Sequence, residues 1–103
     1  MTLQEFMTKA AIPKYRIGCE YLEAAIQHKI DNPRKSMEQI YADVGEKFGV
    51  TPYAVSTSIK RTIRMSFGKM DADVKAKVFR DVKVPTNMIY VESVAYSLRK
   101  GII

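Results

Sequence analysis

The residues best suited to chemistry in this sequence are basic side chains that lie close together without acidic neighbours. Seventeen Lys and Arg against eleven Asp and Glu give a formal net charge of +6. The stretch from residue 47 to residue 70 contains no acidic residue. Its cationic side chains are Lys47, Lys60, Arg61, Arg64 and Lys69. A polyanion binds such a surface with release of counterions, so the pattern favours duplex DNA as the partner over a merely solvated helix face.

Residues that support catalysis or metal binding are few and scattered. Cys19 is the only cysteine and His28 the only histidine, so the chain has neither an internal disulfide nor a Cys/His zinc site. Glu20 and Glu23 are expected to be ordinary surface carboxylates, and Cys19 a small buried hydrophobic residue. The glycines are dispersed, which leaves no phosphate-binding Gly-rich loop. The sequence therefore predicts no enzyme activity, no metal and no cofactor.

The elements that position the basic residues must fit into one domain. A chain of 103 residues with 47% hydrophobic and 27% charged residues has the size and composition of one packed globule, spanning residues 1–103. No stretch approaches the roughly 20 consecutive apolar residues of a membrane helix. Glu5 and Lys9 fall where a signal peptide would be apolar. We therefore expect a cytoplasmic protein without a membrane partner.

Capping residues and apolar spacing predict helices along the whole chain. Thr2 with Glu5, and Ser36 with Gln39, have the spacing of capping boxes. The β-branched residues 82–84 are too few to indicate a sheet. The sequence therefore predicts a compact six-helix, all-α domain. Its helices are expected at residues 2–12, 14–32, 36–49, 51–68, 71–79 and 86–101.

Only residues 49–51 separate the third expected helix from the fourth. A connection this short is typical of a helix-turn-helix, in which two helices cross steeply. Gly45 would let the two backbones approach closely, and an ordinary helical corner would show the same pattern. The cationic fourth helix favours the helix-turn-helix. The apolar residues expected to fix the crossing angle are Val44, Phe48, Val50 and Val55.

The fourth helix has the layout of a recognition helix. Side chains near the N-terminus of such a helix meet base edges, whereas long cations one or two turns later reach phosphates or guanine edges. The N-terminal residues here are small, hydroxyl-bearing or aromatic, and the later exposed ones are basic. The predicted DNA-binding residues are Tyr53, Ala54, Ser56, Thr57, Lys60, Arg61 and Arg64.

Three parts of the sequence together resemble one known family. These parts are the stretch Ile40–Phe48, the frame Val55, Ile59, Lys60, Ile63 and Phe67, and the stretch Val84–Asn87 leading to Ala95 and Leu98. They resemble the C-terminal DNA-binding effector domain of the stage 0 sporulation protein A family, the response regulator that governs sporulation. The resemblance covers roughly residues 9–98. It implies a six-helix domain whose fourth helix enters the major groove, transcriptional control, and self-association on tandem sites through the C-terminal helices.

The sequence departs from that family in two respects. By position, the family's base-reading residues fall on Ala54, Ser56 and Thr57, where the family typically has charged side chains, so the family's operator is not carried over to this chain. The family's full-length regulator also carries an N-terminal receiver domain with a phosphorylatable aspartate, which this chain lacks. Met1 directly before a capped helix favours a free-standing effector domain over a fragment. Its activity would then be set by abundance, a ligand or a partner.

A second function is compatible with the same fold. The chain would then be a protein-interaction module that pairs with a full-length regulator and titrates it. The small side chains at the three base-reading positions keep this alternative open. Candidate interface residues lie on the last helix, although residues at helical spacing belong to a core more often than to an interface. They are Met88, Tyr90 and Tyr96.

Overall fold

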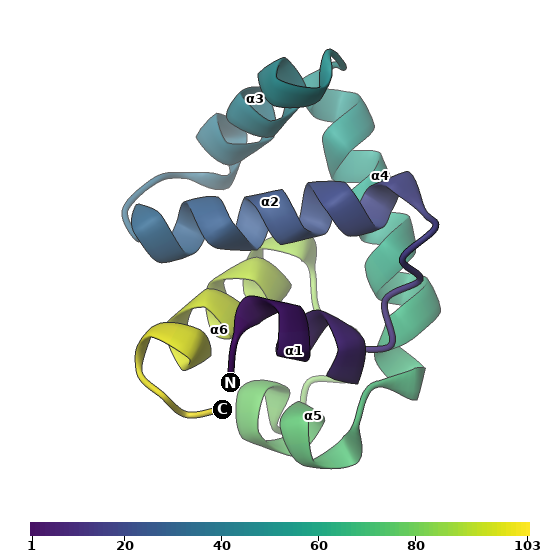
Figure 1. The fold of residues 1–103 in the computed structure, drawn as a ribbon, viewed down its shortest axis with the longest axis vertical. Helices are drawn as coiled ribbons and strands as arrows, with labels where there is room; N and C mark the ends of the chain where they lie inside the picture. Colours follow the sequence, from purple (N-terminus) through teal and green to yellow (C-terminus); the bar gives the residue numbers. More distant parts are fainter.

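The computed structural model describes residues 1–103 and contains helices without strands (Figure 1). The predicted six-helix, all-α fold is confirmed. The predicted fourth helix stops slightly earlier than expected, and a short 3-10 turn, η1, follows it. The elements are α1 (Leu3–Lys9), α2 (Ile17–Asp31), α3 (Met37–Phe48), α4 (Pro52–Ser66), η1 (Phe67–Lys69), α5 (Ala72–Phe79) and α6 (Asn87–Arg99).

Short polar side chains begin most of the helices, as their positions in the sequence predict. In each case the side-chain oxygen accepts a hydrogen bond from a backbone N–H of the first turn, which would otherwise lack a partner. The exception is α2, whose N-cap residue Arg16 makes no such bond. Gly49 ends α3 in the left-handed region with φ 70°, which glycine adopts without strain. The capping residues are Thr2, Ser36, Thr51, Asp71 and Thr86.

The core forms around α2, which crosses the middle of the molecule (Figure 1). α2 packs against α1, α3, α4 and α6, and α4 runs down one side from α3 toward α5. Each large apolar side chain buried here contributes roughly 1.5 to 3 kcal/mol of transfer free energy, so the shared core fixes the position of α4. The largest fully buried apolar side chains include Phe6, Leu22, Ile26, Ile40, Ile59 and Ile63.

Tyr90 belongs to this core, the placement that helical spacing favours over an interface, and it is therefore no longer an interface candidate. Its ring centroid lies 6.1 Å from that of Phe6 and 5.0 Å from that of Phe79. The buried hydroxyl has no hydrogen-bond partner, and burial raises its pKa. Met88 and Tyr96 remain exposed on α6.

Cys19 is buried, as predicted for a small hydrophobic residue. Desolvation raises the pKa of its thiol, which favours the protonated form over the nucleophilic thiolate.

Candidate nucleic-acid interface

α3 and α4 meet at the predicted turn, and the backbones touch at Gly45. A Cβ atom on this glycine would lie 2.6 Å from the carbonyl oxygen of Val50. The N–H of Val50 donates to the carbonyl oxygen of Gly45 at 2.9 Å. Val44 and Val55 are fully buried, and Phe48 and Val50 pack against the core. The expected apolar cluster at the crossing is confirmed.

α4 has one buried face and one exposed face because residues three and four apart lie on the same side of a helix. Thr51 caps the helix by accepting from the N–H of Ala54 at 3.1 Å, and Pro52 occupies its first position. The exposed face carries Lys60, Arg61 and Arg64. The buried face consists of Val55, Ile59, Thr62, Ile63 and Ser66.

The predicted N-terminal contact residues differ in exposure. Tyr53 is 81% exposed at the start of α4 and is free to reach a partner. Ala54, Ser56 and Thr57 are half-buried, which leaves part of each short side chain accessible. The four residues lie within the first two turns of α4, next to the turn from α3.

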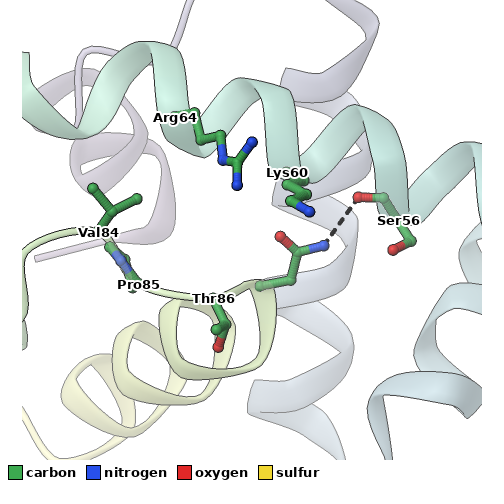
Figure 2. A pocket seen from close by; sticks show the side chains of 7 residues that line it. Ser56, Lys60, Arg64, Val84, Pro85 and Thr86 are labelled. Atoms are coloured by element: carbon green, nitrogen blue, oxygen red, sulfur yellow. Dashed lines mark hydrogen bonds between the residues drawn. The ribbon is translucent and has the colours of Figure 1, made fainter.

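Three of the predicted site residues line one groove. Ser56, Lys60 and Arg64 lie at successive i, i+4 positions on the flank of α4 that faces the start of α6. Together with residues 84–87 they enclose a space of about 440 Å³. Figure 2 shows the Lys60 and Arg64 side chains extending from α4 into this space. Tyr53, Ala54, Thr57 and Arg61 do not line the groove.

Asn87 connects the two walls of that groove, a role that the sequence does not reveal. Its side-chain Nδ2 donates to the carbonyl oxygen of Ser56 at 2.9 Å (Figure 2). The same nitrogen donates to the hydroxyl of Tyr41 on α3 at 3.1 Å. Asn87 therefore ties α6 to both helices of the helix-turn-helix. The sequence indicates only a helix start at this residue, and Thr86 is the residue that caps α6.

Gly18 of α2 contacts α4 on the flank opposite the groove, at Ser58 and Thr62. The sequence does not reveal this contact either. A Cβ atom at this position would lie 1.9 Å from the Thr62 hydroxyl oxygen and 2.9 Å from the carbonyl oxygen of Ser58. The Thr62 hydroxyl already donates to that carbonyl at 2.9 Å. α2 and α4 thus approach so closely that only glycine fits between them.

The cations of α4 have no acidic partners. Four ion pairs form in the molecule, and none involves Lys60, Arg61 or Arg64. One of the four joins Lys35 to Asp43, whose pKa is lowered by the hydrogen bond from that lysine. The absence of acids in the sequence therefore corresponds to unpaired positive charge in space, and an incoming anion would not have to displace an internal carboxylate.

The crossing of α3 and α4 and the cationic face of α4 define the class of this protein, an all-α helix-turn-helix domain. The family model described as "Sporulation initiation factor Spo0A C terminal" matches residues 3–98, and the chain belongs to this family. The family consists of DNA-binding effector domains of sporulation response regulators and is not an enzyme family. No curated protein matches the chain. None of the helices is long and apolar enough to span a bilayer.

Proposed function

We propose that this chain is a sequence-specific, duplex-DNA-binding transcriptional regulator that inserts α4 into the major groove. The observation that carries the proposal is the exposed face of α4, where three cations lie without any ion pair. Membership of a DNA-binding family supports the same function. An α-helix fits the width of the major groove, and its basic side chains replace counterions on the flanking phosphates.

The residues of α4 divide into two roles on this proposal. Thr57 lies opposite the buried Val55 and Ile59, in the first two turns, so it is placed to meet a base edge together with Tyr53. Lys60 and Arg64 lie later on the helix and anchor it to phosphates. Arg61 carries a planar fork that fits either a guanine edge or a phosphate.

Selection of bound fragments from random duplex DNA tests the proposal. We expect enrichment of a defined sequence and a log-log dependence of affinity on salt with a slope of roughly −3 to −5, from about 3 to 6 phosphate contacts. Uniform weak binding, or no binding, would contradict the proposal and favour the module that titrates a full-length regulator.

A charge-matched pair of variants locates the interface. Lys60→Gln with Arg64→Gln removes two positive charges from α4, whereas Arg34→Gln with Lys100→Gln removes two exposed charges from other parts of the chain. We expect the α4 variant to lose far more affinity than its control. Equal losses would mean that net charge alone, and not α4, determines binding.

We further propose that two copies contact each other through α6 on adjacent DNA sites. Ile89 and Tyr96 are seven residues apart, which places them on one side of the helix, and they are 37% and 50% exposed. Ile89→Ser with Tyr96→Ser should lower cooperative binding to paired sites without changing the affinity for a single site. Unchanged cooperativity would contradict this contact.

A further inference from the structure

The groove between α4 and the start of α6 has the chemistry of an anion site. It is lined by residues of two segments far apart in the sequence, 56–64 and 84–87, and no carboxylate is among them. Lys60 and Arg64 supply positive charge, and Ser56 supplies a hydroxyl group (Figure 2). Neither cation forms an ion pair elsewhere in the molecule. The positive charge in the groove is therefore left without a counter-charge from the chain.

The start of α6 adds hydrogen-bond donors to the same place. The N–H groups of Asn87 and Met88 have no acceptor within the chain, because Thr86 Oγ1 accepts only from Ile89. Free N–H groups at the start of a helix favour an anion, and Asn87 lines the same groove as Lys60 and Arg64 of α4.

The two walls of the groove are held at a fixed separation. Asn87 donates to the carbonyl oxygen of Ser56, so the first residue of α6 is tied to the wall that α4 provides. The flank of α4 toward α2 is fixed as well, since Gly18 and Thr62 touch there. A groove built between fixed elements binds an anion without a prior rearrangement, which lowers the entropic cost of binding.

We propose that this groove seats a phosphate group of the DNA backbone, so that the connection from α5 to α6 is a second DNA-contacting element beside α4. The inference rests on the proposed function, since it requires α4 to lie in the major groove. Lys60 and Arg64 leave α4 on the flank toward α6, so the strand at that edge of the major groove passes over the start of α6. The segment 84–87 then helps to position α4 without reading any base.

Two exposed valines in one connection provide a matched test. Val84 lines the groove and is 59% exposed, whereas Val82 is 37% exposed and lies outside the groove. Val84→Glu places a carboxylate beside Lys60 and Arg64, where it occupies the place of the phosphate. Val82→Glu makes the same change in net charge. We expect Val84→Glu to bind all duplexes roughly tenfold more weakly than Val82→Glu, the loss of about one charge-assisted contact. Equal affinities of the two variants would overturn the proposal.

Neutral methylphosphonate substitutions along the selected duplex identify the phosphate itself. In the unchanged protein, methylphosphonate at each contacted phosphate should weaken binding, and the penalty at one of these positions should disappear in Val84→Glu but persist in Val82→Glu and in Arg61→Gln. Inorganic phosphate serves as the alternative ligand, followed through the backbone N–H signals of Asn87 and Met88. If inorganic phosphate shifts these signals and no duplex position shows the coupled penalty, the groove binds free phosphate and the proposal is wrong.

The result also separates this inference from the proposed function. If the unchanged protein enriches a sequence and Thr57→Ala alters that sequence, α4 reads DNA whatever happens at the groove. Equal behaviour of Val84→Glu and Val82→Glu would then overturn only the second contact. Failure of the unchanged protein to bind any duplex would instead overturn the proposed function and, with it, the seat for a backbone phosphate.

Discussion

The two sides of α4 are held in different ways. On the side of α2 and α3, backbones approach each other directly, and Gly18 and Gly45 are the residues that allow it. On the side of α6, the two helices share the core, but at the surface the amide of Asn87 bridges to α4 beside a groove of about 440 Å³. The first side leaves no room even for a methyl group, whereas the second is open to solvent and lined by cations.

This difference separates what positions α4 from what remains free to bind. Close packing leaves few alternative arrangements, because small displacements between packed helices cost dispersion contacts. The exposed cations of the groove form no ion pairs and contribute little to the stability of the fold, so they are available to a ligand. We call the side toward α2 and α3 the closed side of α4 and the side toward α6 its open side. Substitutions on the closed side should therefore lower the stability of the fold, and substitutions on the open side should weaken DNA binding.

The largest effect on folding is expected from Gly18→Ala. Its Cβ would lie 1.9 Å from the Thr62 hydroxyl oxygen and 2.9 Å from a backbone carbonyl, so α2 and α4 must move apart. Overpacking of this kind lowers the free energy of unfolding by about 2 to 3 kcal/mol, which urea denaturation measures. Gly68→Ala is the control, because no atom lies within 4 Å of the added methyl group. Equal stability of the two variants would contradict the closed contact.

A smaller loss is expected from Gly45→Ala. The added Cβ would lie 2.6 Å from the Val50 carbonyl oxygen, but alanine also gains up to about 1 kcal/mol of helix propensity in the last turn of α3. The net loss should be about 1 to 2 kcal/mol. Because the clash is at the turn, DNA affinity should fall further than the loss of stability alone explains. A variant with unaltered melting temperature and DNA binding would remove the helix-turn-helix assignment.

The helices could be predicted from the sequence because their signals are local. Thr2, Ser36 and Thr86 cap helices through hydrogen bonds to N–H groups three residues later, and apolar spacing marks the buried faces between them. Gly45 was predictable for a similar reason, since it lies close in the chain to the turn that it contacts. The cationic face of α4 follows directly from the missing acids.

The remaining contacts are long-range and have no signal in a single sequence. Gly18 resembles any other glycine near the start of a helix until α4 is placed against it. Asn87 meets partners 31 and 46 residues away in the chain. The groove combines residues 56–64 with residues 84–87, which only the packing of α6 brings together. Tyr90, Met88 and Tyr96 could not be divided into core and surface from the sequence, because spacing alone does not tell which side of α6 is covered.

Asn87→Ala should have a moderate effect on both the stability of the fold and the affinity for DNA. It removes both donated hydrogen bonds of Nδ2, each worth roughly 0.5 to 1.5 kcal/mol, and should lower the free energy of unfolding by about 1 kcal/mol or slightly more. Tyr41→Phe removes one of the two bonds and is expected to lose less. DNA affinity should fall in Asn87→Ala without a change in the salt slope, since no charge is removed. If Tyr41→Phe were the more damaging of the two, Asn87 would not be the residue that ties the helices.

The smallest effects on folding are expected from Lys60→Ala and Thr57→Ala, because exposed and half-exposed substitutions usually stay within about 0.5 kcal/mol. Their effects on binding should differ in kind. Lys60→Ala removes a phosphate anchor, so it should weaken all duplexes about equally and reduce the salt slope by about one. Thr57→Ala removes a side chain placed toward a base edge, so it should change the preferred sequence with little change in slope. Titration against selected and scrambled duplexes at several salt concentrations measures both. If neither substitution alters binding to any duplex, α4 does not face DNA, and the open side of this helix serves a protein partner instead.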